Sequence, residues 1–97
     1  MFYAIFRLDK AGSRELRAQI RPTHMRYIEQ SNRTVKLFGP LLTENGTGPV
    51  GSMLVIEAET LSAAQAWADG DPYAKADLFD TVHIHPWKWA IDNGAGD

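Results

Sequence analysis

Hydrophobic residues occupy both alternating faces of two segments of the chain, residues 2–8 and 51–59. This pattern predicts strands that are covered on both sides. In the first segment, one face carries Phe2, Ala4, Phe6 and Leu8, and the other carries Tyr3 and Ile5. Helices of so small a domain can cover only one face of a sheet. We therefore expect a second copy of the chain to cover the other face, which predicts a homodimer.

The segment from residue 14 to residue 32 has a helical composition but contains Pro22. A proline inside a helix removes a hydrogen bond and clashes with the preceding turn, at a cost of about 3 kcal/mol. We therefore expect a short helical turn over residues 14–20 and a main helix that begins at Pro22. His24 would then lie in the first turn of the main helix, where the helix dipole disfavours the imidazolium form.

The second half of the chain predicts another helix and its ends. Ser62 to Gln65 forms a capping-box pattern that opens a helix with Leu61, Ala64, Trp67 and Ala68 toward the sheet. Gly70 suits the left-handed position that ends a helix. Asp71 is a good N-cap for a helical turn around residues 74–78, because Pro72 follows it.

Two further strands complete the predicted architecture, one at residues 35–39, ended by Pro40, and one at residues 81–91. The order β-α-β-β-α-β is that of the split βαβ, ferredoxin-like α+β fold, a four-stranded antiparallel sheet with both helices on one face. Residues 1–91 would form this single domain, and residues 92–97 a polar tail that we expect to fray.

Composition excludes several kinds of site. The 97 residues have a formal net charge of -2, which gives no reason to bind nucleic acid or an acidic membrane. They include no cysteine, so the chain has no disulfide, thiolate nucleophile or cysteine metal site. The first residues lack the basic region of a signal peptide and are too short to span a membrane, so we expect a cytoplasmic protein.

The histidines are the main candidates for chemistry. His24 becomes a candidate base if a carboxylate orients it, and Asp71 could do so because both predicted helices lie on one face of the sheet. The alternatives are a core histidine and a simple helix cap. His83 and His85 point to one face of the last strand, which Trp87 and Trp89 continue, and this face suits an interface better than a metal site. No metal is predicted.

Basic residues recur along the first helical segment, at Arg14, Arg17, Arg21 and Arg26. They could meet an anionic substrate, although a solvated helix face is the more ordinary explanation.

Several short motifs are typical of one protein family. They are Arg21-Pro22-Thr23-His24, Gly39-Pro40-Leu41, Gly51-Ser52, Ala64-Gln65-Ala66-Trp67-Ala68, Asp71-Pro72-Tyr73 and Val82-His83-Ile84-His85-Pro86-Trp87. With these motifs the chain resembles the YCII-related (YciI-like) family. That resemblance implies a dimeric α/β-barrel arrangement of the ferredoxin-like fold and an active site centred on His24 and Asp71. It also implies that Ser52 lines the same pocket. We further predict that Ser52, Tyr73 and Arg21 bind substrate, and we expect no cofactor.

A relative in that family is a dehydrochlorinase acting on a chlorinated hydroxyquinol, and muconolactone isomerases share the fold. This chain departs from the family pattern in a short loop between its second and third strands, and in Trp87 and Trp89 near its end. These changes alter the pocket rim or the interface, so the substrate does not carry over.

Three functions follow from these residues. The first is a cofactor-independent lyase or isomerase in which His24 and Asp71 act as a catalytic pair on a small anionic aromatic or lactone-like substrate. The second is a non-catalytic dimer that binds a small metabolite or assists another enzyme. The third is a purely structural dimer. A base requires His24 and Asp71 to be coupled, whereas a binding pocket does not.

Overall fold

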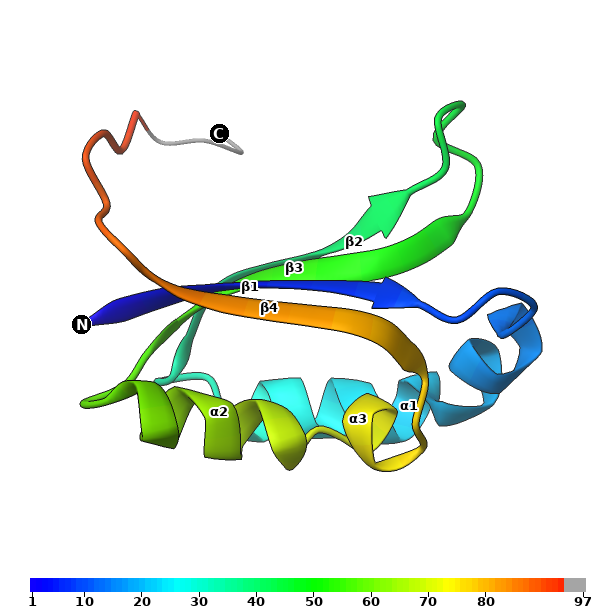
Figure 1. Ribbon diagram of the computed structural model, residues 1–97, viewed down its shortest axis with the longest axis horizontal. Helices are drawn as coiled ribbons and strands as arrows, with labels where there is room; N and C mark the ends of the chain where they lie inside the picture. The colour runs from blue at the N-terminus through cyan, green and yellow to red at the C-terminus, as the bar shows by residue number, and fades with distance from the viewer. Residues whose placement is uncertain (94–97) are drawn as a thin grey trace.

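The computed structural model describes residues 1–93, which form one antiparallel sheet with its helices on one face. In chain order the elements are β1 (Phe2–Asp9), α1 (Arg14–Gln30), β2 (Val35–Leu42), β3 (Pro49–Glu57), α2 (Leu61–Asp69), α3 (Pro72–Lys75) and β4 (Phe79–Trp87). The strand order is β2-β3-β1-β4, and every neighbouring pair is antiparallel. Figure 1 shows the three helices beneath the sheet. The predicted ferredoxin-like α+β fold is confirmed.

The core lies between the sheet and the helices. Tyr3 pairs with Ile56 and Ile5 with Leu54 across β1 and β3, so these four side chains share the face that the helices cover. Ile28 of α1 and Ala64 and Ala68 of α2 complete the buried cluster. Arg7 is the next residue on this face of β1, so its side chain also lies between the sheet and the helices.

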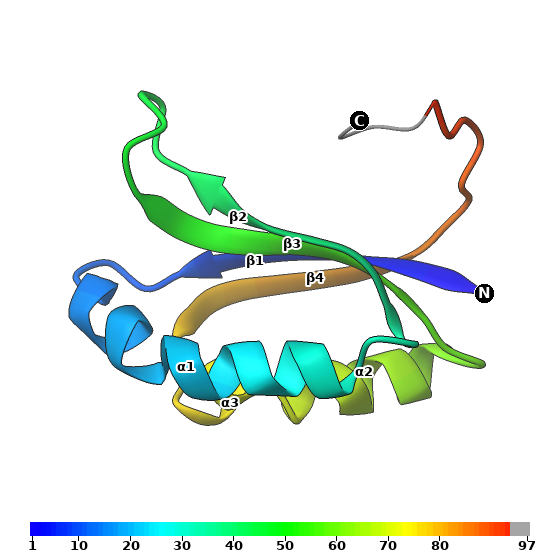
Figure 2. The same cartoon turned by 180° about the vertical axis from the view of Figure 1, so that it is seen from behind.

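Helix α1 runs without interruption from Arg14 to Gln30, so the expected break before Pro22 is wrong. Figure 2 shows that its first turns stand at an angle to the rest, as expected for a proline kink. The helix continues because residues on both sides of Pro22, Arg17 before it and His24 after it, are buried by tertiary packing. His24 therefore lies mid-helix, where a dipole effect confined to the first turn does not act.

Strand boundaries differ from expectation at Pro40. Strand β2 passes through Pro40 to Leu42, because β2 is an edge strand and the missing N–H of a proline costs no sheet hydrogen bond on an open edge. The third strand starts and ends two residues earlier than expected, and β4 spans Phe79–Trp87 in place of residues 81–91. Helix α3 begins at Pro72 with Asp71 as its N-cap, as predicted, but it ends at Lys75, earlier than the turn expected around residues 74–78.

The end of α2 depends on glycine for a different reason than expected. Gly70 has right-handed angles, φ -79° and ψ -12°, so no left-handed cap forms there. A Cβ on Gly70 would lie 2.7 Å from the Tyr27 hydroxyl oxygen. That hydroxyl donates to the Trp67 carbonyl at 2.7 Å and joins α1 to α2. Glycine thus allows the close approach of the two helices.

The helix starts also differ in detail. Thr60, and not Ser62, caps α2, and its hydroxyl accepts from the Ala63 N–H at 3.1 Å. Leu61 is half exposed and does not face the sheet. Ser13 occupies the N-cap position of α1, but its hydroxyl donates to the Lys10 carbonyl.

The second face of the sheet carries exposed apolar side chains. Phe6 and Leu8 of β1 are 43% and 47% exposed, and His83 pairs with Phe6 on the same face.

Within residues 1–93, no helix is long and apolar enough to cross a membrane. The chain is irregular from residue 88, the first residue after β4, to residue 93. Of the predicted tail, residues 92–97, the last four lie outside the described part.

Candidate active site

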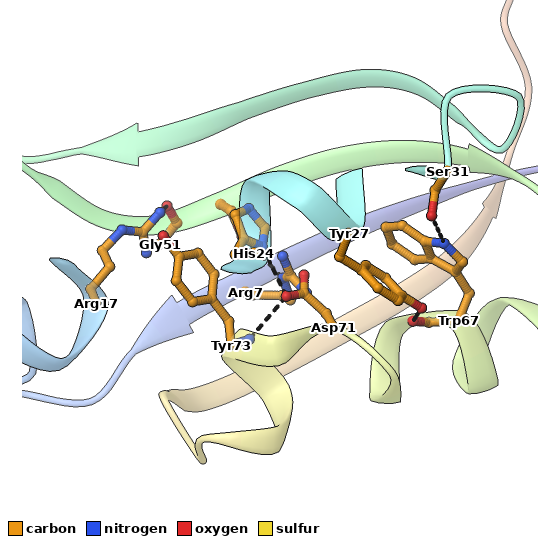
Figure 3. A network of polar contacts seen from close by, with 10 residues as sticks. Arg7, Arg17, His24, Tyr27, Ser31, Gly51, Trp67, Asp71 and Tyr73 are labelled. Carbon is orange, nitrogen blue, oxygen red and sulfur yellow. Dashed lines mark hydrogen bonds and ion pairs between the residues drawn. The ribbon is translucent and has the colours of Figure 1, made fainter. Parts of the chain in front are cut away.

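Asp71 and His24 meet between α1 and the turn that separates α2 from α3. The Asp71 carboxylate caps α3 by accepting from the Tyr73 N–H, with Oδ1 at 2.9 Å. The same Oδ1 lies 2.8 Å from Nδ1 of His24 (Figure 3). Asp71 is therefore a helix cap and a histidine partner at once, and the two interpretations were not alternatives.

The imidazole of His24 is fixed by aromatic neighbours. Its ring stacks on that of Tyr73, with centroids 3.9 Å apart and planes at 12°. Phe38 of β2 lies on another side, 5.3 Å between centroids. Nε2 is buried and has no hydrogen-bond partner among residues 1–93, so the ring keeps one nitrogen uncommitted.

Arg7 of β1 lies next to Asp71, so that Arg7, Asp71 and His24 form a row of buried polar side chains. We did not predict the part of Arg7 in this row. Its Nη1 lies 3.0 Å from Asp71 Oδ2, and its Nε donates to the Ser52 hydroxyl at 3.0 Å. The guanidinium carbon lies 4.3 Å from the centre of the Phe79 ring. One signal for Arg7 was present in the sequence, because Arg7 alternates with Tyr3 and Ile5 and so shares their core-facing side of β1.

The electrostatics of the row favour an ionised carboxylate. Burial would raise the pKa of the Asp71 carboxyl, but the hydrogen bond from His24, the charge of Arg7 and the Tyr73 N–H together bring this pKa below the ordinary aspartate value. An ionised carboxylate only accepts hydrogen bonds. Nδ1 of His24 therefore carries the proton toward Asp71, and in the neutral ring Nε2 holds the lone pair.

A cavity of about 370 Å³ opens beside His24. Its walls come from α1, from β2 and from the loop that leads into β3. Tyr73, Phe38 and Pro40 supply aromatic and apolar surface, and Arg14, Arg17 and Arg21 supply positive charge. A space of this size and character accommodates a small organic ligand with an anionic group.

The arginines of α1 differ in how they are held. Arg17 is buried, donates to Asp9 at 2.7 Å and to the Gly51 carbonyl at 3.1 Å, and its guanidinium lies 4.9 Å from the Tyr73 ring centre. Arg14 and Arg21 are exposed at the cavity, and neither has an ion pair or side-chain hydrogen bond within the described chain.

The ordinary explanation, a solvated helix face, fits the fourth arginine. Arg26 is exposed, its guanidinium donates to the Thr23 hydroxyl, and it does not belong to the cavity wall as far as residues 1–93 show. The basic segment thus divides into a cavity side and a solvent side, a division that depends on how α1 is rotated on the sheet.

The other predicted site residues are distributed between two places. Tyr73 and Arg21 line the cavity, whereas Ser52 is fully buried beneath Arg7 and is not among the described residues of its wall. His83 and His85 lie on the open face of the sheet, their rings parallel with centroids 6.4 Å apart. Residues 1–93 contain no group of three or more His, Asp or Glu arranged to hold a metal ion.

Comparison with known proteins shows which family the chain belongs to. The model of the YCII-related domain matches residues 1–88. The chain belongs to the YCII-related family. The family member YciI of Escherichia coli O6:H1 is 37% identical over 95 residues, covering 91% of this chain and 97% of that protein. An uncharacterized protein of Haemophilus influenzae is 33% identical over the same coverage.

One solved structure that is similar to this YCII-related chain is that of an enzyme with a bound ligand. The 5-chloro-2-hydroxyhydroquinone dehydrochlorinase TftG from Burkholderia phenoliruptrix AC1100, in complex with 2,5-dihydroxybenzoquinone, superposes with a TM-score of 0.83. It is 29% identical to this chain, and the match covers 91% of this chain and 94% of the other.

Proposed function

We propose that this YCII-related protein is a small acid–base enzyme, a lyase or isomerase, that acts on a small anionic aromatic or lactone-like ring. The observation that carries the proposal is the state of His24. One ring nitrogen is bound to Asp71, and the other has no partner within the described residues, in a ring that forms part of the cavity wall. That is the arrangement a general base needs.

The reaction begins when Nε2 of His24 takes a proton from a carbon or hydroxyl of the substrate. Asp71 holds the ring in the required tautomer and stabilises the imidazolium that forms. The electron pair left on the substrate either expels a leaving group such as chloride or moves through the ring. In the first case the imidazolium gives its proton to solvent after chloride leaves, and in the second case it returns its proton to another atom of the substrate. Such proton transfer contributes roughly a hundredfold to ten-thousandfold in rate.

The cavity accounts for the proposed substrate class. Proton loss makes the substrate more negative, and Arg14 and Arg21 offer two guanidinium groups without partners of their own in residues 1–93. Arg21 binds the anionic oxygen in this proposal, and Tyr73 presents a ring beside it. The Burkholderia relative supports the proposal because it is a dehydrochlorinase and its structure holds a dihydroxybenzoquinone. Ser52 acts indirectly, by holding Arg7.

The open face of the sheet supports a homodimer as part of the same proposal. Phe6, Leu8 and Leu37 expose 41–47% of their surface there. Covering them with a second copy would remove apolar area from water, which is favourable at about 25 cal/mol per Å². A cytoplasmic location is the corresponding proposal for the dimer.

The test is a substrate screen with matched histidine variants. The protein is incubated with chlorinated hydroxyquinols, hydroxybenzoquinones and muconolactones, and turnover is followed by ultraviolet absorbance and chloride release. We expect turnover by the parent and a loss of about 10²- to 10⁴-fold in kcat/KM for His24→Gln. His83→Gln is the control, because His83 lies on the opposite face of the sheet, and it should leave kcat/KM unchanged.

Two results would contradict the proposal that this protein is an enzyme with His24 as its base. If a ring compound binds in the cavity but no member of the panel turns over, the non-catalytic binding module is favoured. If His24→Gln and His83→Gln have the same kcat/KM, His24 is not the base.

A further inference from the structure

Arg7 is a buried charge in a position that a hydrophobic residue would otherwise fill. Its side chain is 1% exposed, and it follows Tyr3 and Ile5 on the core-facing side of β1. A buried ion pair gains little stability compared with well-packed apolar residues, because both ions lose their hydration. Packing alone therefore does not explain an arginine at this position.

The geometry joins Arg7 to His24 through one carboxylate. Arg7 binds Oδ2 of Asp71, while Oδ1 receives Nδ1 of His24 and the Tyr73 N–H. With both oxygens engaged, the carboxylate cannot rotate without breaking a contact. Arg7 thereby holds Oδ1 toward the imidazole, a contact that Figure 3 marks between Asp71 and His24.

The charges of the row lead to a second consequence. With a neutral His24 the row of Arg7, Asp71 and His24 has no net charge, and with an imidazolium it has a charge of +1. Without Arg7 the same two states would have charges of -1 and 0. In a buried site of low dielectric the less charged state is favoured, so Arg7 opposes imidazolium formation and Asp71 alone would promote it.

We infer that Arg7 is a positioning residue that holds the Asp71 carboxylate toward His24 and opposes protonation of the ring, so that Nδ1–H faces Asp71 and the lone pair stays on Nε2. This rests on the proposed function only in assigning Nε2 to proton abstraction. Arg7 is buried and is not among the described residues of the cavity wall.

The other ionisable groups near the row do not replace Arg7. Asp9 and Arg17 form an ion pair with each other at 2.7 Å, so their charges largely cancel. Burial raises the pKa of both Tyr27 and Tyr73, which stay neutral. Arg14 and Arg21 of the cavity also oppose an imidazolium, but they remain in place in every variant compared below.

The test follows the His24 ring directly by ¹⁵N NMR as pH is varied, with no substrate present. The variants are Arg7→Met, Asp71→Asn and the double variant that carries both substitutions. Arg7→Met leaves the carboxylate unopposed, so the ring should become half protonated about one to three pH units higher than in the double variant. Asp71→Asn leaves the guanidinium unopposed, so its ring should become half protonated at a lower pH than in the double variant.

Two controls separate charge from packing. Arg7→Lys retains the positive charge and should restore the parental titration in large part. His83 and His85, on the far face of the sheet, serve as internal references and should titrate alike in all variants.

The inference is overturned if Arg7→Met titrates at the same pH as the parent, because Arg7 would then act only as a structural anchor. If Arg7→Met does not fold, the comparison of Asp71→Asn with the double variant decides the question. Removing Arg7 in that background must raise the pH of half protonation. Because no substrate is used, this result is independent of whether the protein proves to be an enzyme.

Discussion

His24 and Asp71 are 47 residues apart in the chain and 2.8 Å apart in the fold, Nδ1 to Oδ1. The contact joins the middle of α1 to the turn between α2 and α3. It also places a carboxylate with a lowered pKa in the core, where its stability contribution depends on pH.

Replacing Asp71 by asparagine should destabilise the protein and weaken its acid sensitivity. At neutral pH, Asp71→Asn leaves Arg7 without its counter-charge, and we expect a loss of about 3 kcal/mol in the free energy of unfolding. Because the pKa of Asp71 in the fold lies below the ordinary value of 3.8, its contribution is present above that pH. This contribution is lost as pH falls from 3.8 through the pKa that Asp71 has in the fold. The difference in free energy of unfolding between parent and variant should therefore narrow over that pH range.

Urea unfolding between pH 2 and 7 measures both effects. Asp80→Asn is the control, because Asp80 is exposed and has no side-chain partner in residues 1–93. A constant difference between parent and Asp71→Asn across this range would contradict the assignment of the acid sensitivity to Asp71.

Arg21 and Arg26 provide a matched pair for testing the cavity. Both are exposed arginines of α1, but only Arg21 belongs to the described cavity wall. A hydrogen bond to a charged group contributes about 1.5–3 kcal/mol, so Arg21→Gln should weaken binding of an anionic ring about ten- to a hundredfold. Titration with 2,5-dihydroxybenzoquinone, followed by calorimetry, measures this, and Arg26→Gln should bind as the parent does. Equal loss in both variants would indicate a general charge effect.

Gly70 should not tolerate alanine while Tyr27 retains its hydroxyl. The added Cβ would lie 2.7 Å from that oxygen and would break its hydrogen bond to the Trp67 carbonyl. We expect Gly70→Ala to lower the free energy of unfolding by about 1–3 kcal/mol. The backbone at Gly70 is right-handed, so the conformation itself suits alanine.

The double variant Tyr27→Phe/Gly70→Ala tests the cause of that loss. Removing the hydroxyl leaves the nearest ring carbon at 3.4 Å, an ordinary contact distance. Gly70→Ala should therefore cost much less in the Tyr27→Phe background, as measured by chemical denaturation. Additive losses would mean that Tyr27 is not the obstacle.

A charge on the open face of the sheet should separate the proposed dimer. We expect the parent to be dimeric by light scattering at micromolar concentration. Phe6→Glu should be monomeric, because it buries an unpaired carboxylate in the interface. Val82→Glu is the control, since Val82 is exposed to the same extent but pairs with Arg7 on the helix side of the sheet. A monomeric parent would contradict the homodimer.

Local patterns were sufficient for much of the fold. Alternation in β1 identified the two faces of the sheet, because side chains of a strand point to opposite sides regardless of the partner. The dipeptide Asp71-Pro72 identified the start of α3, because capping is an interaction between residues two or three positions apart. The end of α2 at Gly70 was predicted correctly, but glycine is required there because the Tyr27 hydroxyl of α1 lies close by, and not because a left-handed cap forms.

Local patterns failed where the outcome depended on packing between distant segments. Pro22 kinks α1 without ending it, because buried contacts of Arg17 and His24 hold both halves of the helix on the sheet.

The sequence by itself determined the order of the elements, the sheet faces and the cap at Asp71, all of which depend on neighbours in the chain. Only the tertiary structure decided that Arg7 lies behind Asp71, that Ser52 holds Arg7, and that Arg21 faces the cavity while Arg26 faces solvent. These relations depend on how helices are rotated and stacked on the sheet, and that is set by the sum of contacts between segments far apart in the chain.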